Sequence, residues 1–204
     1  MDSMIKEYMQ EENLIAKGSS RDVYRAGSLV IKKHTHVLGY KQSKQEEVIY
    51  NSLLNEKWKK YLSKPYYVCE DYAIFDYVKP LQTNALHGCD IGCCDLEETY
   101  SPAVQDFEQG GEAGLVSYLK ENYEVVVDDL YMTHNIGINE TETNFVFLDY
   151  GLTKELSEEY DKALQNGEIS YYVIECCSAC GGDATYKITG DKEELILCEF
   201  CGRK

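Results

Sequence analysis

Two acids and an amide in the second half of the chain have the order and spacing of a site for magnesium and a nucleotide. Asp129 precedes a loop, Asn135 opens a short expected strand after it, and Asp149 ends the next strand in the sequence Asp-Tyr-Gly. A loop aspartate can orient a hydroxyl group, while an asparagine and a second aspartate can hold a metal ion on phosphates. The region 125–153 therefore predicts that Asn135 and Asp149 bind Mg²⁺ and that Asp129 orients a phosphate acceptor.

An apolar strand expected over residues 28–33 carries a lysine suited to phosphate binding. Alternation along the strand places Val30 and Lys32 on one face. A lysine at the end of such a strand, facing a phosphate loop, can bind the α and β phosphates. Lys33 is the alternative, although its side chain should point the opposite way. The turn 18–20 lies between two further expected strands, where its backbone N–H groups can cover phosphates.

A helix expected over residues 44–58 carries the partner of that lysine. Its apolar residues recur every three or four positions, and Glu46 lies one turn before them on the buried side. A buried carboxylate needs a cationic partner, so we expect an ion pair between Glu46 and Lys32. Glu47 is the alternative. A hairpin over 65–75 should follow the helix and lead into a connector whose backbone can face an adenine.

The order of these features resembles that of the protein-kinase-like fold, in the form of the small atypical bacterial and phage-type kinases and the aminoglycoside-phosphotransferase group. The resemblance covers residues 13–153. It is based on six motifs: Gly18-x-Ser20-x-x-Val23, Val30-Ile31-Lys32, a helix with Glu46, Phe75-Asp76-Tyr77-Val78, Asp129 with Asn135, and Asp149-Tyr150-Gly151.

The resemblance implies ATP and Mg²⁺ as ligands and gives roles to single residues. The catalytic residues would be the loop acid Asp129 and the pair of Lys32 and Glu46. Asn135 and Asp149 would hold the magnesium ion. The nucleotide would be bound by Gly18, Ser19, Ser20, Val30, Lys32, Asp76, Val78, Asn135 and Asp149.

Three departures from the family pattern affect the expected activity. Five residues separate Asp129 from Asn135, one more than in the family, so the loop bulges, His134 partly substitutes, or the site is degenerate. The His-Arg pair that precedes the loop aspartate in the family is absent. Only 24 residues, 152–175, follow the Asp-Tyr-Gly motif before the next module. We therefore expect a truncated C-terminal lobe without the usual platform for a peptide substrate.

The C-terminal region has the cysteine spacing of a structural zinc site. Cys177 and Cys180 form one C-x2-C pair, and Cys198 and Cys201 form a second pair after 17 intervening residues. A hairpin is expected between the pairs, and the whole resembles a zinc ribbon. Four thiolates complete a tetrahedron around Zn²⁺ and leave no open position, which predicts a structural ion. Cys176 is a spare residue that can replace Cys177.

A second group of metal-binding residue types occurs within residues 87–95. The group consists of His87, Cys89, Cys93 and Cys94, and its C-x3-C-C spacing matches no standard site. A second metal ion and a loop with free or packed thiols are both compatible with it.

The charge of the chain argues against nucleic acid as a partner. The formal net charge of the 204 residues is -16, whereas phosphate backbones select for lysine and arginine. The expected ribbon carries four lysine and arginine residues against five acidic ones. An acidic surface suits a soluble enzyme or a protein that docks on a basic protein partner.

The N-terminal residues and the hydropathy pattern predict a cytoplasmic protein. The first 13 residues are polar and acidic, without the apolar segment of a signal peptide. No run approaches the roughly 18 apolar residues of a membrane helix, so no membrane association is expected. In the cytoplasm, the nine cysteines are expected to be metal ligands and free thiols rather than disulfides.

The sequence thus predicts an α+β fold in two parts. A protein-kinase-like domain spans 1–175, with an N-terminal lobe at about 13–78 and a reduced C-terminal lobe at about 79–175, and a zinc ribbon spans 176–204. The expected function is transfer of the γ-phosphate of ATP to a hydroxyl acceptor, with a protein among the candidate substrates. The alternative is a catalytically inactive pseudokinase that acts as an acidic inhibitor or adaptor of a basic protein.

Overall fold

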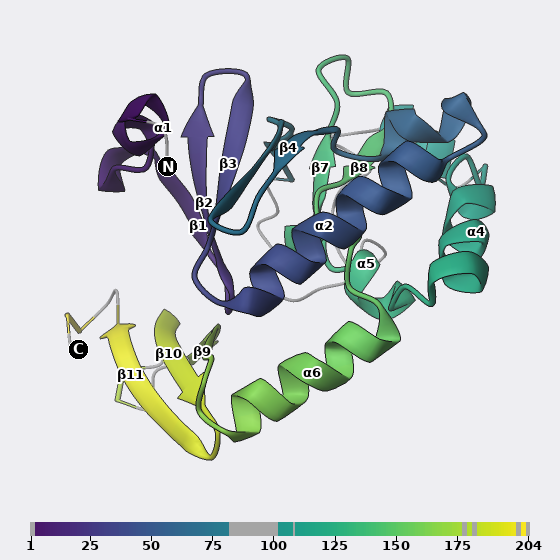
Figure 1. The fold of residues 1–204 in the computed structure, drawn as a ribbon. Coiled ribbons are helices and arrows are strands. Elements are labelled where there is room, and N and C mark those ends of the chain that lie inside the picture. The colour runs from purple at the N-terminus through teal and green to yellow at the C-terminus, as the bar shows by residue number, and fades with distance from the viewer. Residues whose placement is uncertain are drawn as a thin grey trace.

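Short apolar stretches separated by glycine and polar turns fold into three antiparallel sheets with helices beside them (Figure 1). The computed structural model describes residues 3–81, 102–107, 109–176, 179–180, 183–198 and 201–202. The α+β class expected from the sequence is confirmed. Among these described residues, no helix is long and apolar enough to cross a membrane.

The largest sheet is built from the N-terminal half of the chain, in the order β1-β2-β3-β5-β4. Gly27 has a φ of 67°, which lets the chain turn from β2 into β3 within two residues. Lys32 on β3 pairs with Val23 on one side and with Ala73 on the other, so it lies in the central strand. The strands are β1 Leu14–Lys17, β2 Arg21–Ala26, β3 Leu29–His34, β4 Pro65–Val68 and β5 Tyr72–Asp76.

Helix α2 (Val37–Ser52) packs against strands β3, β4 and β5 of this sheet. It differs from the helix expected over 44–58 at both ends. It begins seven residues earlier because the side chain of His36 accepts a hydrogen bond from the backbone of Leu38 and caps the first turn. It ends earlier because Asn55 caps a separate 3-10 helix, η2 (Glu56–Tyr61). Leu54, expected in the apolar stripe, lies in the break and is 94% exposed.

A three-stranded sheet, β6-β7-β8, carries the acids and the amide of the second half. Its strands are β6 Lys79–Pro80, β7 Ile136–Ile138 and β8 Phe145–Phe147. The helix α4 (Ala113–Tyr123) agrees with the helix expected there. The apolar run 125–127 reads as strand-like in the sequence, and this is true only of its start. Val125 forms an isolated β-bridge with Thr153 and Val126 is extended, whereas α5 (Val127–Leu130) is a helical turn whose Leu130 packs into the main core. A 3-10 turn, η4 (Thr133–Asn135), then leads into β7, so Asn135 precedes that strand.

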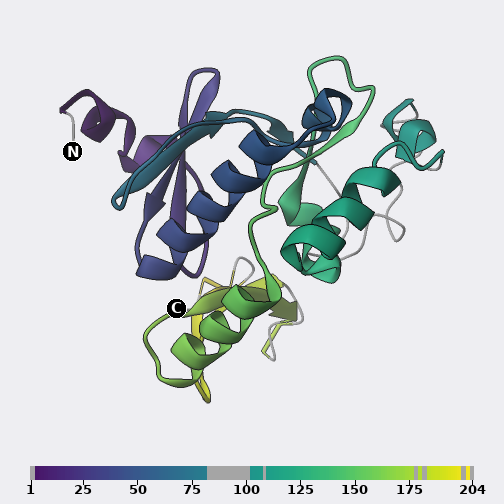
Figure 2. The same cartoon turned by 45° about the vertical axis from the view of Figure 1, so that its right-hand side comes forward.

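The C-terminal part consists of one helix and one sheet. The side chain of Thr153 caps α6 (Lys154–Gln165), which packs on α2 through a cluster of Leu38, Leu156, Ala163 and Ile169. The sheet β11-β10-β9 follows and lies beside the end of α6 (Figures 1 and 2). The hairpin expected between the cysteine pairs is present as β10 (Asp183–Thr189) and β11 (Lys192–Cys198), and β9 (Tyr171–Cys176) adds a strand that was not expected.

Candidate functional site

Lys32 and Glu46 form a buried ion pair between the central strand and helix α2. The Nζ atom of Lys32 lies 3.0 Å from both carboxylate oxygens of Glu46. It also donates a hydrogen bond to the carbonyl of Leu148 at 2.8 Å. The ion pair expected from the sequence is therefore present, whereas Glu47 pairs with Lys44 on the surface of α2.

Arg21, the first residue of β2, is a second buried cation in contact with Glu46. Its Nη1 atom donates to Glu46 at 3.2 Å and to Ser43 at 3.3 Å, and its Nη2 atom donates to the carboxylate of Asp149. The side chain passes so close to α2 that a Cβ atom on Gly39 would lie 2.7 Å from the Cγ atom of Arg21. Gly39, Ser43 and Glu46 occupy one helical face and leave room for the guanidinium group. The motifs of the sequence did not predict a role for Arg21.

Asp149 follows β8 and accepts hydrogen bonds on both carboxylate oxygens. Arg21 donates to Oδ2, and the side-chain amide of Gln42 donates to Oδ1 at 2.6 Å. Two residues later the backbone crosses α2 at close range. A Cβ atom on Gly151 would lie 2.3 Å from the carbonyl oxygen of Gln42 and 2.7 Å from the Cγ atom of Glu46. Only glycine fits this approach, which gives a physical reason for the glycine of the Asp-Tyr-Gly motif.

Helix α6 supports Asp149 through a tyrosine that the sequence did not single out. The hydroxyl of Tyr160 donates to the side-chain carbonyl of Gln42 at 2.7 Å and also shares a hydrogen bond with the hydroxyl of Ser20. Gln42 is thereby oriented with its amide group toward Asp149. Burial raises the pKa of Tyr160 to about 12, so the hydroxyl stays protonated at neutral pH.

Asp129 and Asn135 meet across two consecutive helical turns. The backbone N–H of Met132 donates to the carbonyl of Asp129, and the N–H of Asn135 donates to the carbonyl of Met132. These turns accommodate the five-residue spacing. The Nδ2 atom of Asn135 donates to the carbonyl of Asp129 at 2.7 Å and to its carboxylate at 3.1 Å. The loop acid and the amide are therefore adjacent, as the sequence requires for a shared site.

Five ionisable side chains form what we call the ion cluster. They are Arg21, Lys32, Glu46, Asp129 and Asp149. Burial raises the pKa of Asp129 to about 7, and the negative charge of Asp149 adds to this effect. Burial alone would also raise the pKa of Asp149, but the positive charges of Arg21 and Lys32 outweigh it and hold that pKa below its usual range. Two aspartates in one site thus differ in how readily they accept a proton.

The surroundings also shift the pKa values of Lys32 on β3 and Glu46 on α2. Burial raises the pKa of Glu46 to about 7, although Lys32 and Arg21 pull it down. Burial lowers the pKa of Lys32 despite the nearby carboxylate. When all its members are ionised, the ion cluster holds three negative and two positive charges. In that fully ionised state it has one more negative than positive charge in a largely buried place.

The turn 18–20, expected to cover phosphates, is fixed from several sides. The backbone N–H of Gly18 donates to the carbonyl of Arg21 at 2.7 Å and closes the turn. Ser20 is buried, and its carbonyl accepts hydrogen bonds from Thr35 and His36. Ser19 is partly exposed between them. The turn lies directly before Arg21 and so beside the ion cluster, while its role toward phosphates stays a prediction.

The three residues expected near an adenine lie on or after the large sheet. Val30 belongs to a small apolar cluster with Ala73 and Phe75. Asp76 ends β5, where its N–H donates to Lys64 and its carbonyl accepts from Ser63. Both main-chain groups of Asp76 are thus engaged within the protein. Val78 follows in the link to β6, and its expected contact stays a prediction.

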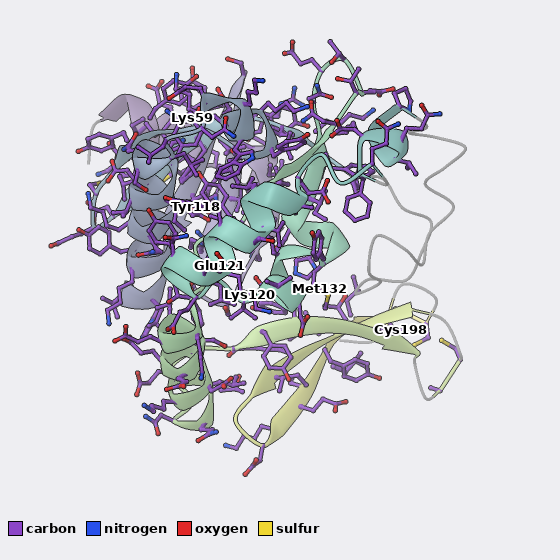
Figure 3. The ribbon with its side chains drawn as sticks, turned by 90° about the vertical axis from the view of Figure 1, so that its right-hand side faces the viewer. Lys59, Tyr118, Lys120, Glu121, Met132 and Cys198 are labelled. Carbon is purple, nitrogen blue, oxygen red and sulfur yellow. The ribbon has the colours of Figure 1, made fainter. Side chains whose placement is uncertain are left out.

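Three cysteines meet at the C-terminal sheet and can hold a metal ion. The sulfur atoms of Cys180, Cys198 and Cys201, the cysteine cluster, all lie within 4.8 Å of one another. Cys198 ends β11 (Figure 3), and its side chain is buried. The N–H of Gly202 donates to the carbonyl of Cys198 and turns the chain after the second pair. Cys177 lies outside the described residues, as do His87, Cys89, Cys93 and Cys94.

Comparisons with known proteins give no independent assignment. No protein-family model matches the chain, and none of the curated proteins is significantly similar to it.

Proposed function

We propose that this protein is an ATP- and magnesium-dependent phosphotransferase with a protein-kinase-like N-terminal lobe, a reduced C-terminal lobe and a zinc ribbon. The observation that carries the proposal is the meeting of Lys32, Glu46 and Asp149 in one buried cluster. These residues come from three separate motifs that the resemblance places in one site. The order of the elements, from the turn 18–20 through β3 and α2 to β8, also agrees with it.

The donor atoms and the charge of the ion cluster suit a divalent cation. Carboxylate and amide oxygens are ligands that Mg²⁺ prefers. Because the Nδ2 atom of Asn135 donates to Asp129, the amide oxygen is the atom of Asn135 left for a metal. Asp149 would supply a carboxylate oxygen. Burial and, to a smaller extent, the charge of Asp149 raise the pKa of Asp129, and a bound cation would relieve the repulsion between the two carboxylates.

Each residue of the site would have a separate role in phosphoryl transfer. A bound magnesium ion would neutralise charge on the phosphates. Lys32, held by Glu46, would bind phosphate oxygens. Asp129 would accept a hydrogen bond from the acceptor hydroxyl and take its proton, a role that suits a carboxylate with a pKa of about 7 at neutral pH. Asn135 would keep the carboxylate of Asp129 in place through its amide hydrogen.

The cysteine cluster would bind a structural zinc ion. Three cysteine sulfur atoms converge in the described residues, and the C-x2-C spacing assigns Cys177, or Cys176 in its place, as the fourth ligand. Four thiolates leave no position for a substrate. The ion would therefore stabilise the sheet β11-β10-β9 rather than take part in phosphoryl transfer.

A second candidate function is favoured by the state of Asp149. Both of its carboxylate oxygens are occupied by Arg21 and Gln42, so a metal would have to displace or tolerate these partners. A pseudokinase with a permanently closed site would have this arrangement. Such a protein, with its net charge of -16, would act by docking on a basic protein partner.

A thermal melt with and without magnesium and ATP distinguishes the two functions. A ligand at about 100 times its Kd adds about 2.7 kcal/mol to the free energy of unfolding, which is several degrees in Tm for a chain of this size. We expect the zinc-loaded wild type to show a magnesium-dependent shift and Asp149→Asn to lose it. Asp161→Asn, on the exposed face of α6, is the matched control. A folded wild type with no shift leaves the pseudokinase function.

A further inference from the structure

Arg21 occupies the position in the ion cluster where its charge acts most directly on Asp149. Its guanidinium group is buried and bridges two carboxylates, Glu46 on α2 and Asp149 after β8. The other cation, Lys32, is directed to Glu46 and to the carbonyl of Leu148. Arg21 is thus the cation with a hydrogen bond to the carboxylate that the proposed function assigns to magnesium.

The surroundings of Arg21 show that this position is built rather than incidental. Gly39 leaves space for its aliphatic stem, since a Cβ atom there would lie 2.7 Å from the Cγ atom of Arg21. Ser43 accepts a hydrogen bond from Nη1 one helical turn further on. Gln42 holds the opposite oxygen of Asp149. A divalent ion on Asp149 would come within a few ångströms of the guanidinium, where like charges repel strongly because water is scarce.

We propose that Arg21 competes with Mg²⁺ for Asp149, so that the site takes up magnesium efficiently only together with a phosphate-bearing ligand. This inference rests on the proposed function in one respect, the assignment of Asp149 as a metal ligand. Without phosphates, the guanidinium neutralises Asp149 and keeps the affinity for magnesium low. Phosphate oxygens offer the guanidinium fork an alternative partner of matching geometry. Magnesium and the nucleotide then bind cooperatively, each raising the affinity for the other by the same factor.

The decisive experiment is a calorimetric titration of the protein with Mg²⁺ alone, which measures its affinity for the metal. Arg21→Gln removes the positive charge but keeps a hydrogen-bond donor, and we expect it to bind Mg²⁺ at least about tenfold more tightly than the wild type. The double variant Arg21→Gln/Asp149→Asn should lose that binding. Arg25→Gln is the matched control, because Arg25 lies exposed on the same strand and should leave the affinity unchanged. Equal or weaker magnesium binding by Arg21→Gln overturns the inference.

Two further measurements keep the test decisive. Arg21→Lys retains the charge, so its affinity for magnesium should stay close to that of the wild type, and a gain equal to that of Arg21→Gln would contradict the electrostatic cause. If Arg21→Gln does not fold, the wild type decides. Magnesium alone should then bind at least about tenfold more weakly than it does in the presence of a non-hydrolysable ATP analogue, and equal affinities overturn the proposal.

The two proposals fail in different ways. If magnesium and ATP stabilise the wild type but Arg21→Gln gains no affinity for the metal, only the competition is wrong. If magnesium and ATP do not stabilise the wild type while Arg21→Gln binds magnesium through Asp149, the competition is right and the phosphotransferase function is wrong. Absence of Asp149-dependent metal binding in every variant, with or without nucleotide, overturns both.

Discussion

Two carboxylates of the ion cluster, Asp129 and Asp149, respond differently to pH because they have different neighbours. Asp149 is hydrogen-bonded to a guanidinium group, so its pKa is low. Asp129 has only the amide of Asn135 as its described hydrogen-bond donor and faces the charge of Asp149, so burial dominates and its pKa is about 7. A residue with this pKa changes its charge near neutral pH, where most assays are carried out.

Stability should therefore fall between about pH 4 and pH 8 in a way that depends on Asp129. A carboxyl group whose folded pKa is raised contributes stability below its unfolded pKa, about 4, and that contribution is lost as pH rises through the folded value. We expect Asp129→Asn to abolish this part of the pH dependence, on the order of 3 kcal/mol between pH 5 and pH 8. Urea denaturation at pH 5 and pH 8 measures it.

The neighbouring Asp128 provides the control for that experiment. It is exposed on the same helical turn, so Asp128→Asn should keep the wild-type pH dependence. Glu46 also has a raised pKa and contributes with the same sign in both proteins, so it cancels in the comparison. The stabilising effect of the low pKa of Asp149 is lost only at more acidic pH, below this window. A wild type and an Asp129→Asn variant with parallel stability profiles would contradict the assignment.

At the scale of elements, α2 is the part on which the site is assembled. Its buried face is Leu38, Gly39, Gln42, Ser43, Glu46 and Ile49, and four of these six residues are polar or lack a side chain. Because this buried face is hardly more hydrophobic than the exposed face of the helix, the hydrophobic periodicity in the sequence locates only the second half of the helix. The buried polar residues at helical spacing are the signal that could have indicated charged partners. Which partners they have depends on β2, β8 and α6, and local sequence does not show that.

Two helical glycines allow a sharp test of this packing. Alanine is intrinsically better than glycine in a helix by about 1 kcal/mol. In α4, Gly114→Ala should be neutral or stabilising, because the new Cβ would meet only the ring of Trp58 at 3.3 Å. In α2, the new Cβ atom of Gly39→Ala would lie 2.4 Å from the carbonyl oxygen of Ser20, which is a backbone atom and cannot move easily.

Gly39→Ala should therefore lose about 1–3 kcal/mol of stability in spite of its better helix propensity. Urea denaturation of both variants measures the difference. Equal effects of the two substitutions would show that α2 does not approach the turn 18–20 as closely as the structure has it.

At the scale of the whole molecule, the sequence predicted strands and motifs better than it predicted contacts between them. The hairpins, the ion pair of Lys32 with Glu46 and the cysteine pairs follow from short-range patterns. The contacts of Arg21 with Asp149 and of Tyr160 with Gln42 join residues more than a hundred positions apart. Nothing in the local spacing of these residues indicates such a partner, which is why Arg21 and Tyr160 were missed.

Removal of the metal should affect the C-terminal sheet and leave the ion cluster in place. We expect one zinc ion per chain in the wild type and none in Cys198→Ser, because the proposed ion needs all four thiolates. Cys69→Ser is the matched control, since Cys69 lies in the turn between β4 and β5, away from the C-terminal sheet, where its sulfur donates to the carbonyl of Tyr72. Elemental analysis measures the metal content, and hydrogen exchange should show faster exchange in β9–β11 of Cys198→Ser. Full zinc content in Cys198→Ser would contradict the assignment.

The separation of Arg21 and Asp149 along the chain has a consequence for synthesis on the ribosome. The two residues lie 128 positions apart, so at about 5–20 residues per second Asp149 is made roughly 6–26 s after Arg21. For most of that interval, until Asp129 is made, Glu46 is the only acid of the ion cluster in the nascent chain with Arg21 and Lys32. Burial of two cations beside one carboxylate is unfavourable, so we expect both side chains to stay hydrated during this interval. The chain must therefore be made as far as Asp149 before the surroundings of Arg21 reach their final structure.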